Sequence, residues 1–326
     1  MTRLLAVGVC LLSMLSPSAL AFDEAYPSRP VRLIAAAAPG GNPDVLARLL
    51  AYKLSEALGK PFVVENVPGA GGIVAAKSVL SSAPDGHVLM LGDSGAMAIN
   101  VALNPDVGYN PLKDFTPITA LATVPTVLVI NAGVAARTLD EFVRLAKSQP
   151  GKLTYGSAGY GSVHHLTMAL FAERSGIDLL HVPYRGGTAL VNGLLTGEIQ
   201  AGWSGIPNVL SLIESGQLRA LCISILKRSP SMPAVPTCAE LGYEGFDIAT
   251  MIGLQASAGL PEPILARLQA AVAKALREGD VAERMRTLGI DLQENGTARY
   301  RQFMQDDLAR YQDAARRLKL NLIKAQ

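Results

Sequence analysis

The sequence lacks the features of nucleic-acid-binding, disulfide-scaffolded and disordered proteins. Its 326 residues carry 29 Lys and Arg against 27 Asp and Glu with no basic or acidic run, which argues against a nucleic-acid partner held by bulk charge. Three cysteines are too few for a disulfide-rich scaffold or a four-cysteine zinc site. Aromatic residues make up only 5%, but hydrophobic residues make up 49% and charged residues 17%, which is the composition of a folded protein.

The motifs of enzymes, metal sites and nucleotide sites are incomplete. Residues 92–95 (Gly-Asp-Ser-Gly) match the core around the nucleophile of trypsin-like proteases, but no Ala-Ala-His-Cys segment supplies a base. The four histidines show no His-Glu-x-x-His pattern, Val74 stands where a dinucleotide fingerprint needs glycine, and a Walker A lysine is absent. We therefore expect no catalysis, no cofactor and no metal. Ser94 is expected at a strand end with its hydroxyl facing a cleft, and catalysis by Ser94 is the alternative.

The N-terminus has the pattern of an export signal. Arg3 precedes an apolar run over residues 4–15, and residues 19–21 (Ala-Leu-Ala) fit the small-x-small cleavage pattern. The run is shorter than the roughly 20 residues needed to span a bilayer, which disfavours the alternative of a retained membrane anchor. We expect a signal peptide over residues 1–21, cleavage after Ala21, and export of the mature protein to a bacterial periplasm.

Strand, turn and helix patterns alternate along the rest of the chain. Apolar, strand-like runs occupy residues 31–38, 62–66, 87–91, 124–130, 153–157, 180–185, 199–203 and 218–222. Asn42, followed by Pro43, predicts a helix N-cap, and Thr-x-x-Glu capping boxes begin at Thr138 and Thr237. Strands that alternate with Gly-rich turns and helices predict parallel sheets with right-handed crossovers.

The alternation restarts in the middle of the chain, which predicts an α/β protein of two lobes with a cleft between them. We expect the first lobe to comprise residues 22–124 and 226–326, and the second lobe residues 125–225. The helix predicted from residue 297 to about residue 319 is expected to pack back on the first lobe. A monomer is expected, because nothing in the sequence marks an assembly surface.

Two Gly-rich turns that precede predicted helices are candidates for binding an anion. Backbone N–H groups at a helix N-terminus attract anions, and glycine lets the backbone approach closely. Turns from opposite lobes would hold the two ends of a small carboxylate; the alternative is that the glycines only close tight turns. The candidate residues are Gly40, Gly41 and Asn42 in the first turn and Ser157, Ala158, Gly161 and Ser162 in the second.

Further candidates stand at strand ends or next to a turn, each with a structural alternative. Arg185 would pair with a ligand carboxylate or form an ion pair within the protein. His165 would face the ligand or form a local hydrogen bond. Trp203 and Ser204 would line a pocket or fill the core. Cys222 and Cys238 would form a disulfide in an oxidising compartment or remain free thiols, and the sequence leaves this open.

Several short motifs, taken in order, resemble a known family. They lie at residues 26–30, 39–44, 64–72, 84–86, 109–118, 155–162, 165–166, 181–187, 236–237 and 240–242. On these motifs the chain resembles the extracytoplasmic solute receptors of tripartite tricarboxylate transporters, the Bug or TctC-like family. The resemblance implies a type II periplasmic-binding-protein fold, in which two α/β lobes close on a small organic acid. It also implies carboxylate binding by Gly40, Gly41 and Asn42 and by the turn over residues 157–162.

The chain departs from the usual family pattern after Gly197 and Glu198, where carboxylates commonly follow. Gln200 and Ser204 stand in this stretch, together with the larger Trp203. An amine-bearing ligand such as aspartate would lose an acidic partner there. We therefore hypothesise a carboxylate without a cation, stacked near Trp203 if the ligand is aromatic.

The resemblance implies a receptor that captures a small carboxylate and delivers it to a large and a small membrane subunit of a transporter. A ligand sensor that signals to a membrane kinase without transport is the alternative, and the sequence does not separate the two. The fold by itself does not choose among ligands.

Overall fold

The computed structural model describes residues 26–104, 106–293 and 296–318. The expected signal peptide over residues 1–21 and its cleavage site after Ala21 lie outside the described residues. Within these described ranges, no helix has the length and apolar character that crossing a membrane requires.

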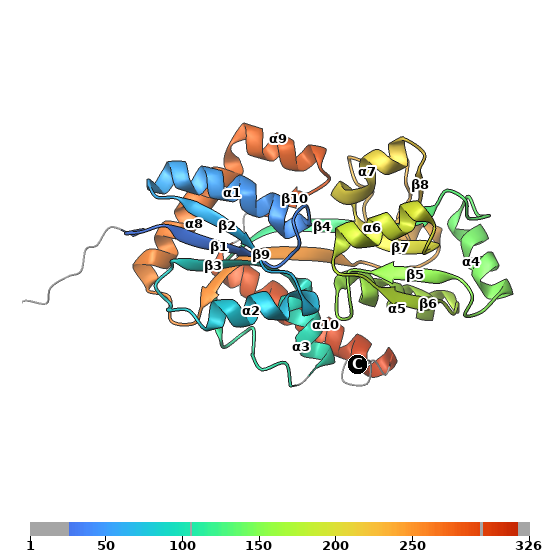
Figure 1. The fold of residues 1–326 in the computed structure, drawn as a ribbon, viewed down its shortest axis with the longest axis horizontal. Coiled ribbons are helices and arrows are strands. Elements are labelled where there is room, and N and C mark those ends of the chain that lie inside the picture. Colours follow the sequence, from blue (N-terminus) through green and yellow to red (C-terminus); the bar gives the residue numbers. More distant parts are fainter. Residues whose placement is uncertain (1–25, 105, 294–295, 319–326) are drawn as a thin grey trace, which may run out of the picture.

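The first lobe is built on parallel strands with helices on both faces (Figure 1). Its strands β1 (Val31–Ala35), β2 (Phe62–Asn66) and β3 (Val88–Asp93) pair in the order β2-β1-β3. Its helices are α1 (Asn42–Leu58), α2 (Ile73–Leu80), α8 (Glu262–Arg277) and α9 (Gly279–Thr287), with the short elements η1 (Ala70–Gly72), η2 (Gly95–Ile99) and α3 (Asn100–Leu103). Leu33 and Leu89 of the sheet share a hydrophobic core with Leu50 and Leu268 of the covering helices.

The second lobe repeats this arrangement. Its parallel strands β5 (Thr154–Ser157), β6 (Leu180–Pro183) and β7 (Ala201–Gly205) pair in the order β7-β5-β6, and β8 (Leu218–Ile223) follows in the chain. Its helices are α4 (Leu139–Ser148), α5 (Val163–Ser175), α6 (Gly187–Thr196) and α7 (Ile206–Glu214). The capping box before α4 is confirmed, because the Glu141 N–H donates to Thr138 Oγ1 (3.2 Å). The second box, with reciprocal hydrogen bonds between Thr237 and Glu240, forms at the start of the short helix η3 (Ala239–Leu241).

Two long strands, β4 (Phe115–Asn131) and β9 (Ala249–Ser257), join the lobes, and β4 runs through both (Figure 1). β4 pairs antiparallel with β9 in the first lobe and with β7 and β8 in the second, and β10 (Asp291–Leu292) adds a short pair to β4. The strand expected over residues 124–130 is therefore only the second half of β4. Almost every residue of β4 is buried, so no polar alternation marks where the strand begins.

The N-terminus of α1 differs from the sequence prediction by one residue. Gly41, in an extended conformation, is the N-cap, and Asn42 is the first helical residue with Pro43 behind it. Proline is tolerated in the first helical turn because an N–H there has no partner within the helix. Gly41 has no side chain that could cap the helix, so the first N–H groups of α1 remain available to another acceptor.

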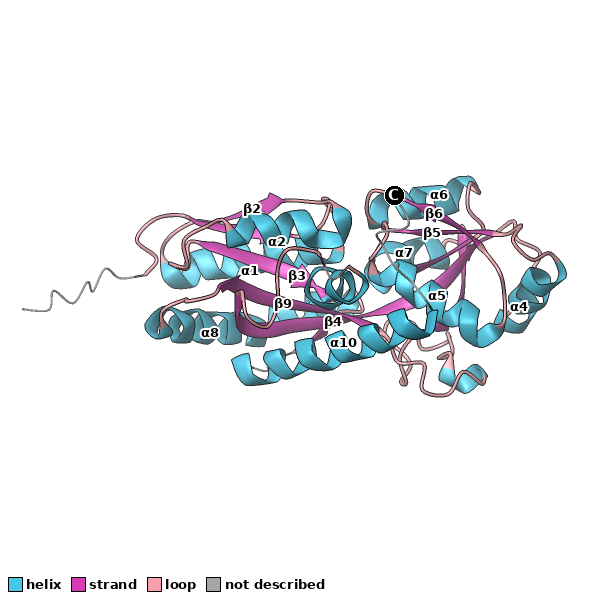
Figure 2. Ribbon diagram, turned by 90° about the horizontal axis from the view of Figure 1, so that it is seen from below, coloured by secondary structure: helices cyan, strands magenta, loops and turns pink. Residues whose placement is uncertain are grey.

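The C-terminal helix α10 (Thr297–Leu318) runs beneath both lobes (Figure 2). Tyr300 and Met304 pack with Phe115 in a core of the first lobe. Tyr311 packs with Phe171 in a core of the second lobe. α10 therefore packs on the first lobe, as expected, and also on the second, so the helix ties the two lobes together.

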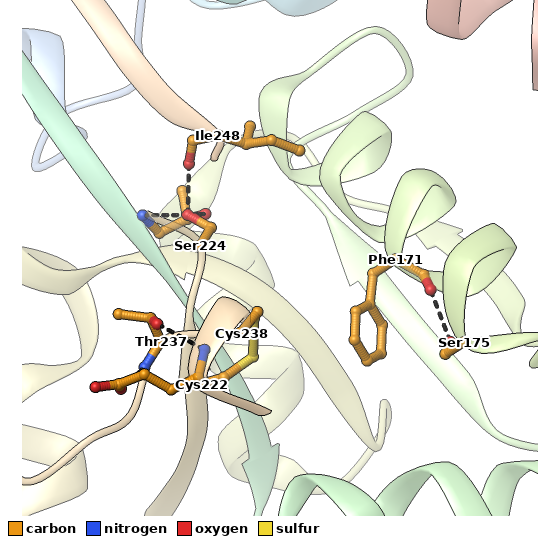
Figure 3. The surroundings of a disulfide bond; sticks show 9 residues. Phe171, Ser175, Cys222, Ser224, Thr237, Cys238 and Ile248 are labelled. Atoms are coloured by element: carbon orange, nitrogen blue, oxygen red, sulfur yellow. Dashed lines mark hydrogen bonds between the residues drawn. A yellow bond between two sulfur atoms is a disulfide. The ribbon is translucent and has the colours of Figure 1, made fainter. Parts of the chain in front are cut away.

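Cys222 at the end of β8 and Cys238 before η3 form a disulfide (Figure 3). Close by, the Ile248 N–H donates to the Ser224 carbonyl (2.7 Å), and the Ser224 hydroxyl donates to the Ile248 carbonyl. Cys238 and Ile248 both lie in the core of the second lobe. We therefore propose that the chain returns to the first lobe after Ile248 rather than near residue 225, because the segment between these positions is bonded to the second lobe.

Candidate functional site

A cleft of about 820 Å³ lies between the two lobes, a volume in the range of small-molecule sites. The first lobe lines it with residues 36–38, 41–43, 68–73, 93, 95, 100, 104 and 250. The second lobe lines it with residues 158–160, 162–164, 183–188 and 208. Most of these residues follow the carboxyl ends of the parallel strands β1, β2, β3, β5 and β6. Open α/β sheets bind their ligands at these strand ends.

Several helices begin at the cleft. The N-caps of α1, α2, α5 and α6 are Gly41, Gly72, Ser162 and Gly186, and all of them line it. The first N–H groups of a helix have no partner within the helix, and the helix dipole places partial positive charge at this end. The cleft therefore favours an anionic ligand, approached by backbone N–H groups from both lobes.

The N-terminus of α6 is the part of the cleft best suited to a carboxylate. Its N-cap Gly186 has no side-chain cap, and its first turn carries no acidic residue. Arg185 precedes it, lines the cleft and forms no ion pair with another described residue. A guanidinium beside unpaired N–H groups is a strong arrangement for binding a carboxylate.

The partial positive charge at the N-terminus of α1 is partly neutralised by Asp44, a residue of the helix itself. Asp44 lies in the first turn and accepts hydrogen bonds from the Gly40 N–H (2.8 Å) and the Asn66 amide (2.8 Å), and it pairs with Arg48 (3.0 Å). Burial alone would raise the pKa of Asp44, but these donors hold it below its usual value. α1 is therefore a weaker anion site than α6.

Some of the residues singled out from the sequence line the cleft, namely Gly41, Asn42, Ala158, Ser162 and Arg185. Gly40 and Gly161 shape the adjoining turns, and both have positive φ angles (80° and 71°) that favour glycine.

Ser157 and His165 lie behind the wall of the second lobe. Ser157 is fully buried and its hydroxyl bonds to His181 Nε2 (2.7 Å). The rings of His165 and His181 stack with their centroids 4.4 Å apart, and Tyr160 packs edge-on against both. The neighbouring His164 lines the cleft instead, and burial lowers the pKa of its imidazole to about 4, so it is neutral at neutral pH.

Ser94, Trp203 and Ser204 point away from the cleft. The Ser94 hydroxyl donates to Asp307 of α10 (2.8 Å). Trp203 is fully buried, with its ring stacked on Phe246 at a centroid distance of 5.7 Å. Ser204 is also fully buried. The hypothesis of an aromatic ligand stacked on Trp203 therefore gains no support from this geometry.

The sequence reasoning missed Asp93 and Asn100, which line the cleft from the first lobe. The Asn100 amide donates to the carbonyls of Gly71 and Gly95 (2.8 Å each) and so joins two Gly-rich turns. A Cβ on Gly71 would lie 2.6 Å from Asn100 Nδ2, so only glycine fits there. The sequence places Asp93 at the carboxyl end of a predicted strand, where ligand-binding residues are common, but several other residues share this position and nothing in the sequence distinguishes Asp93 from them.

Two α/β lobes around a cleft lined with helix N-termini define the class of bilobed solute-binding proteins. Within that class, the chain belongs to the tripartite tricarboxylate transporter family receptors, whose family model matches residues 46–320. This confirms the family and the type II periplasmic-binding-protein fold expected from the sequence. The protein is accordingly a periplasmic solute-binding receptor and not an enzyme.

Several relatives resemble the chain over almost its whole length. BugT of Bordetella pertussis is 36% identical over 317 residues, which cover 97% of each chain. The structure of MatC from Rhodopseudomonas palustris with bound malate is 34% identical with a TM-score of 0.85, covering 89% of this chain and 99% of that one. The structure of Rpa4515 from R. palustris with adipate is 30% identical with a TM-score of 0.88, covering 91% and 99%.

Proposed function

We propose that the protein captures a small organic acid in the cleft between its lobes and delivers it to a tripartite tricarboxylate-type transporter. The observation that carries this proposal is the convergence of uncapped helix N-termini and Arg185 on one cleft. The bound malate of MatC and adipate of Rpa4515 are small carboxylates, which supports the same ligand class here. The transport partners would be one large and one small membrane subunit, and the receptor itself is proposed to be a monomer.

The two walls of the cleft would have different roles in holding the acid. Arg185 and the first N–H groups of α6, at Gly187 and Thr188, would bind one carboxylate from the second lobe. The N-terminal turns of α1 and α2 would contact the ligand from the first lobe. A ligand that touches both walls favours the closed arrangement of the lobes, because only that arrangement makes both sets of contacts.

Export remains part of the proposal. Residues 1–21 would direct secretion and be removed after Ala21. Mass spectrometry of protein recovered from the periplasm tests this, because it measures the N-terminal residue directly. An N-terminus other than Phe22 would contradict the proposed cleavage site.

Calorimetric titration with a panel of organic acids tests the binding proposal. The protein should first be unfolded and refolded, which removes any ligand carried through purification. Arg185→Gln is expected to weaken binding of the best acid at least tenfold, since it removes a charge-assisted pair worth about 1.5–3 kcal/mol. Arg144→Gln is the matched control, because Arg144 is exposed on α4 of the same lobe and does not line the cleft.

Two results would count against the proposal. If no organic acid in the panel binds the wild-type protein, carboxylate capture is wrong. If an acid binds and Arg185→Gln binds it equally well, the receptor function stands but the carboxylate does not lie at α6.

A further inference from the structure

The first-lobe wall of the cleft carries an acidic side chain that faces the ligand space. Asp93 is the last residue of β3 and lines the cleft, and among its described lining residues no other is an Asp or Glu. The Ala96 N–H at the start of η2 donates to Asp93 Oδ1 (3.2 Å). No described side chain donates to the carboxylate or forms an ion pair with it. Asp93 is therefore held by the backbone while its charge is left without a cation.

The surroundings of Asp93 do not neutralise its charge. Behind it stand the buried phenols of Tyr109 and Tyr300 and, on α10, Asp307 with its partner Arg310 (3.3 Å). The pKa values of both phenols are raised, mainly by burial and further by the charge of Asp93. Burial likewise raises the pKa of Asp93 to about 6.

A second acceptor without a partner belongs to the same wall of the cleft. Asn100 is buried, and its Nδ2 is committed to the carbonyls of Gly71 and Gly95. Exchanging the amide oxygen and nitrogen would break both bonds, so the orientation of the amide is determined by its partners. Asn100 Oδ1 is consequently a buried acceptor without a donor. A buried acceptor of this kind costs free energy until a donor reaches it.

The two walls of the cleft thus differ in the charged side chain that each carries. Arg185 and the start of α6 attract a carboxylate from the second lobe, whereas Asp93 presents an acidic acceptor from the first lobe, beside the starts of α1 and α2. A second carboxylate next to Asp93 would be repelled, and an ammonium or hydroxyl group would be attracted. From this polarity we propose that Asp93 determines specificity: the receptor selects organic acids that carry an ammonium or hydroxyl group beside the bound carboxylate, and Asp93 accepts a hydrogen bond from that group.

This inference rests on the proposed function, since it assumes that the cleft binds an organic acid. It also changes the ligand expectation drawn from the sequence. The acidic partner that an amine would miss around Gln200 and Ser204 is provided by Asp93, from a strand of the other lobe. Amino and hydroxy acids thus become the favoured ligands.

The test uses series of acids that differ in a single substituent. Suitable series are aspartate, malate and succinate; alanine, lactate and propionate; and 2-aminoadipate with adipate. In the series that contains the best ligand, we expect the amino or hydroxy acid to bind the refolded wild-type protein at least tenfold more tightly than the unsubstituted acid. Asp93→Asn should reduce this ratio to threefold or less, while Asp247→Asn, an exposed aspartate that does not line the cleft, should leave it unchanged.

A wild-type pH profile gives a second measurement that needs no variant. The same affinity ratio should fall as Asp93 becomes protonated below about pH 6. The unsubstituted acid, measured at each pH, corrects for titration of the ligand carboxylate. Across the cleft stand the guanidinium of Arg185 and the imidazole of His164, and the pKa of His164, lowered by burial to about 4, keeps that residue neutral over this range.

The failures of the two proposals are distinguishable. If unsubstituted acids bind as tightly as their amino and hydroxy analogues, or if Asp93→Asn keeps the wild-type ratio, the role of Asp93 is wrong and carboxylate capture stands. If Asp93→Asn does not fold, a ratio that is flat between pH 5 and pH 8 overturns the role of Asp93. If no acid in any series binds, both proposals fail.

Discussion

Asp93 should make the ligand-free protein less stable at neutral pH than an uncharged residue would. Burial raises the pKa of its carboxyl from 3.8 to about 6, and each pH unit of such a difference corresponds to about 1.4 kcal/mol. Because the folded-state pKa lies above the unfolded value, ionisation disfavours the folded state. The cost is absent below about pH 4 and reaches about 3 kcal/mol above about pH 7.

The substitution Asp93→Asn removes this ionisation and keeps the shape of the side chain. The amide oxygen can still accept the hydrogen bond from the Ala96 N–H. We therefore expect the free energy of unfolding of Asp93→Asn, relative to that of wild type, to be about 3 kcal/mol larger at pH 8 than at pH 4, so that the variant gains stability as the pH rises. The gain in stability would come at the expense of ligand selectivity, which is a common relation at binding sites.

Urea denaturation followed by circular dichroism, on refolded ligand-free protein, measures this difference between pH 4 and pH 8. Asp247→Asn, the same substitution at an exposed aspartate outside the cleft, is the matched control. A difference between Asp93→Asn and wild type that stays constant, or that shrinks as pH rises, would refute the reasoning. The carboxylate would then be compensated in the folded protein, and its role as an unpaired acceptor would lose its electrostatic basis.

Two further predictions separate structural residues from the cleft. Trp203→Ala should lower the free energy of unfolding by about 3–5 kcal/mol, because it leaves a cavity at a fully buried aromatic site, yet it should change ligand affinity by no more than about twofold. Urea denaturation measures the first effect and calorimetric titration the second. A large loss of affinity in folded protein would contradict the placement of Trp203 in the core. The free energy of unfolding of the double variant Cys222→Ser with Cys238→Ser should be about 3 kcal/mol lower than that of wild type, as expected for opening a loop with a sequence separation of 16. Reducing agent should lower the melting temperature of wild type but not of this variant. Equal sensitivity of both proteins to reducing agent would show that the disulfide does not stabilise the fold.

A feature of the fold can be predicted from the sequence when the residues that form it are close together in the chain. The capping boxes at Thr138 and Thr237 were predicted correctly, because a capping box is formed by residues three positions apart. The course of β4 through both lobes was not, because uniform burial removes the alternation from which a strand is recognised. The disulfide between Cys222 and Cys238 was left open for a related reason: only the folded chain brings β8 next to the segment before η3.

The candidate site was predicted in part. Turns with glycine before a helix were recognisable, and Gly41, Ser162 and Arg185 do line the cleft. Side chains at strand ends were harder to assign, because successive residues of a strand point to opposite faces. Asp93 faces the cleft, whereas its neighbour Ser94 faces Asp307 on α10.

The sequence by itself determined the α/β class, the alternation of strands and helices in each lobe, the two-lobe plan and the membership of the receptor family. These follow from periodicity, turn residues and short motifs, all of which act over a few neighbouring residues. Only the tertiary structure decided that Trp203 belongs to the core and Asp93 to the ligand cleft. The register and twist of strands distant in sequence set the direction of each side chain, so Arg185 at the start of α6 and Asp93 at the end of β3 line one cleft only after the two lobes have folded.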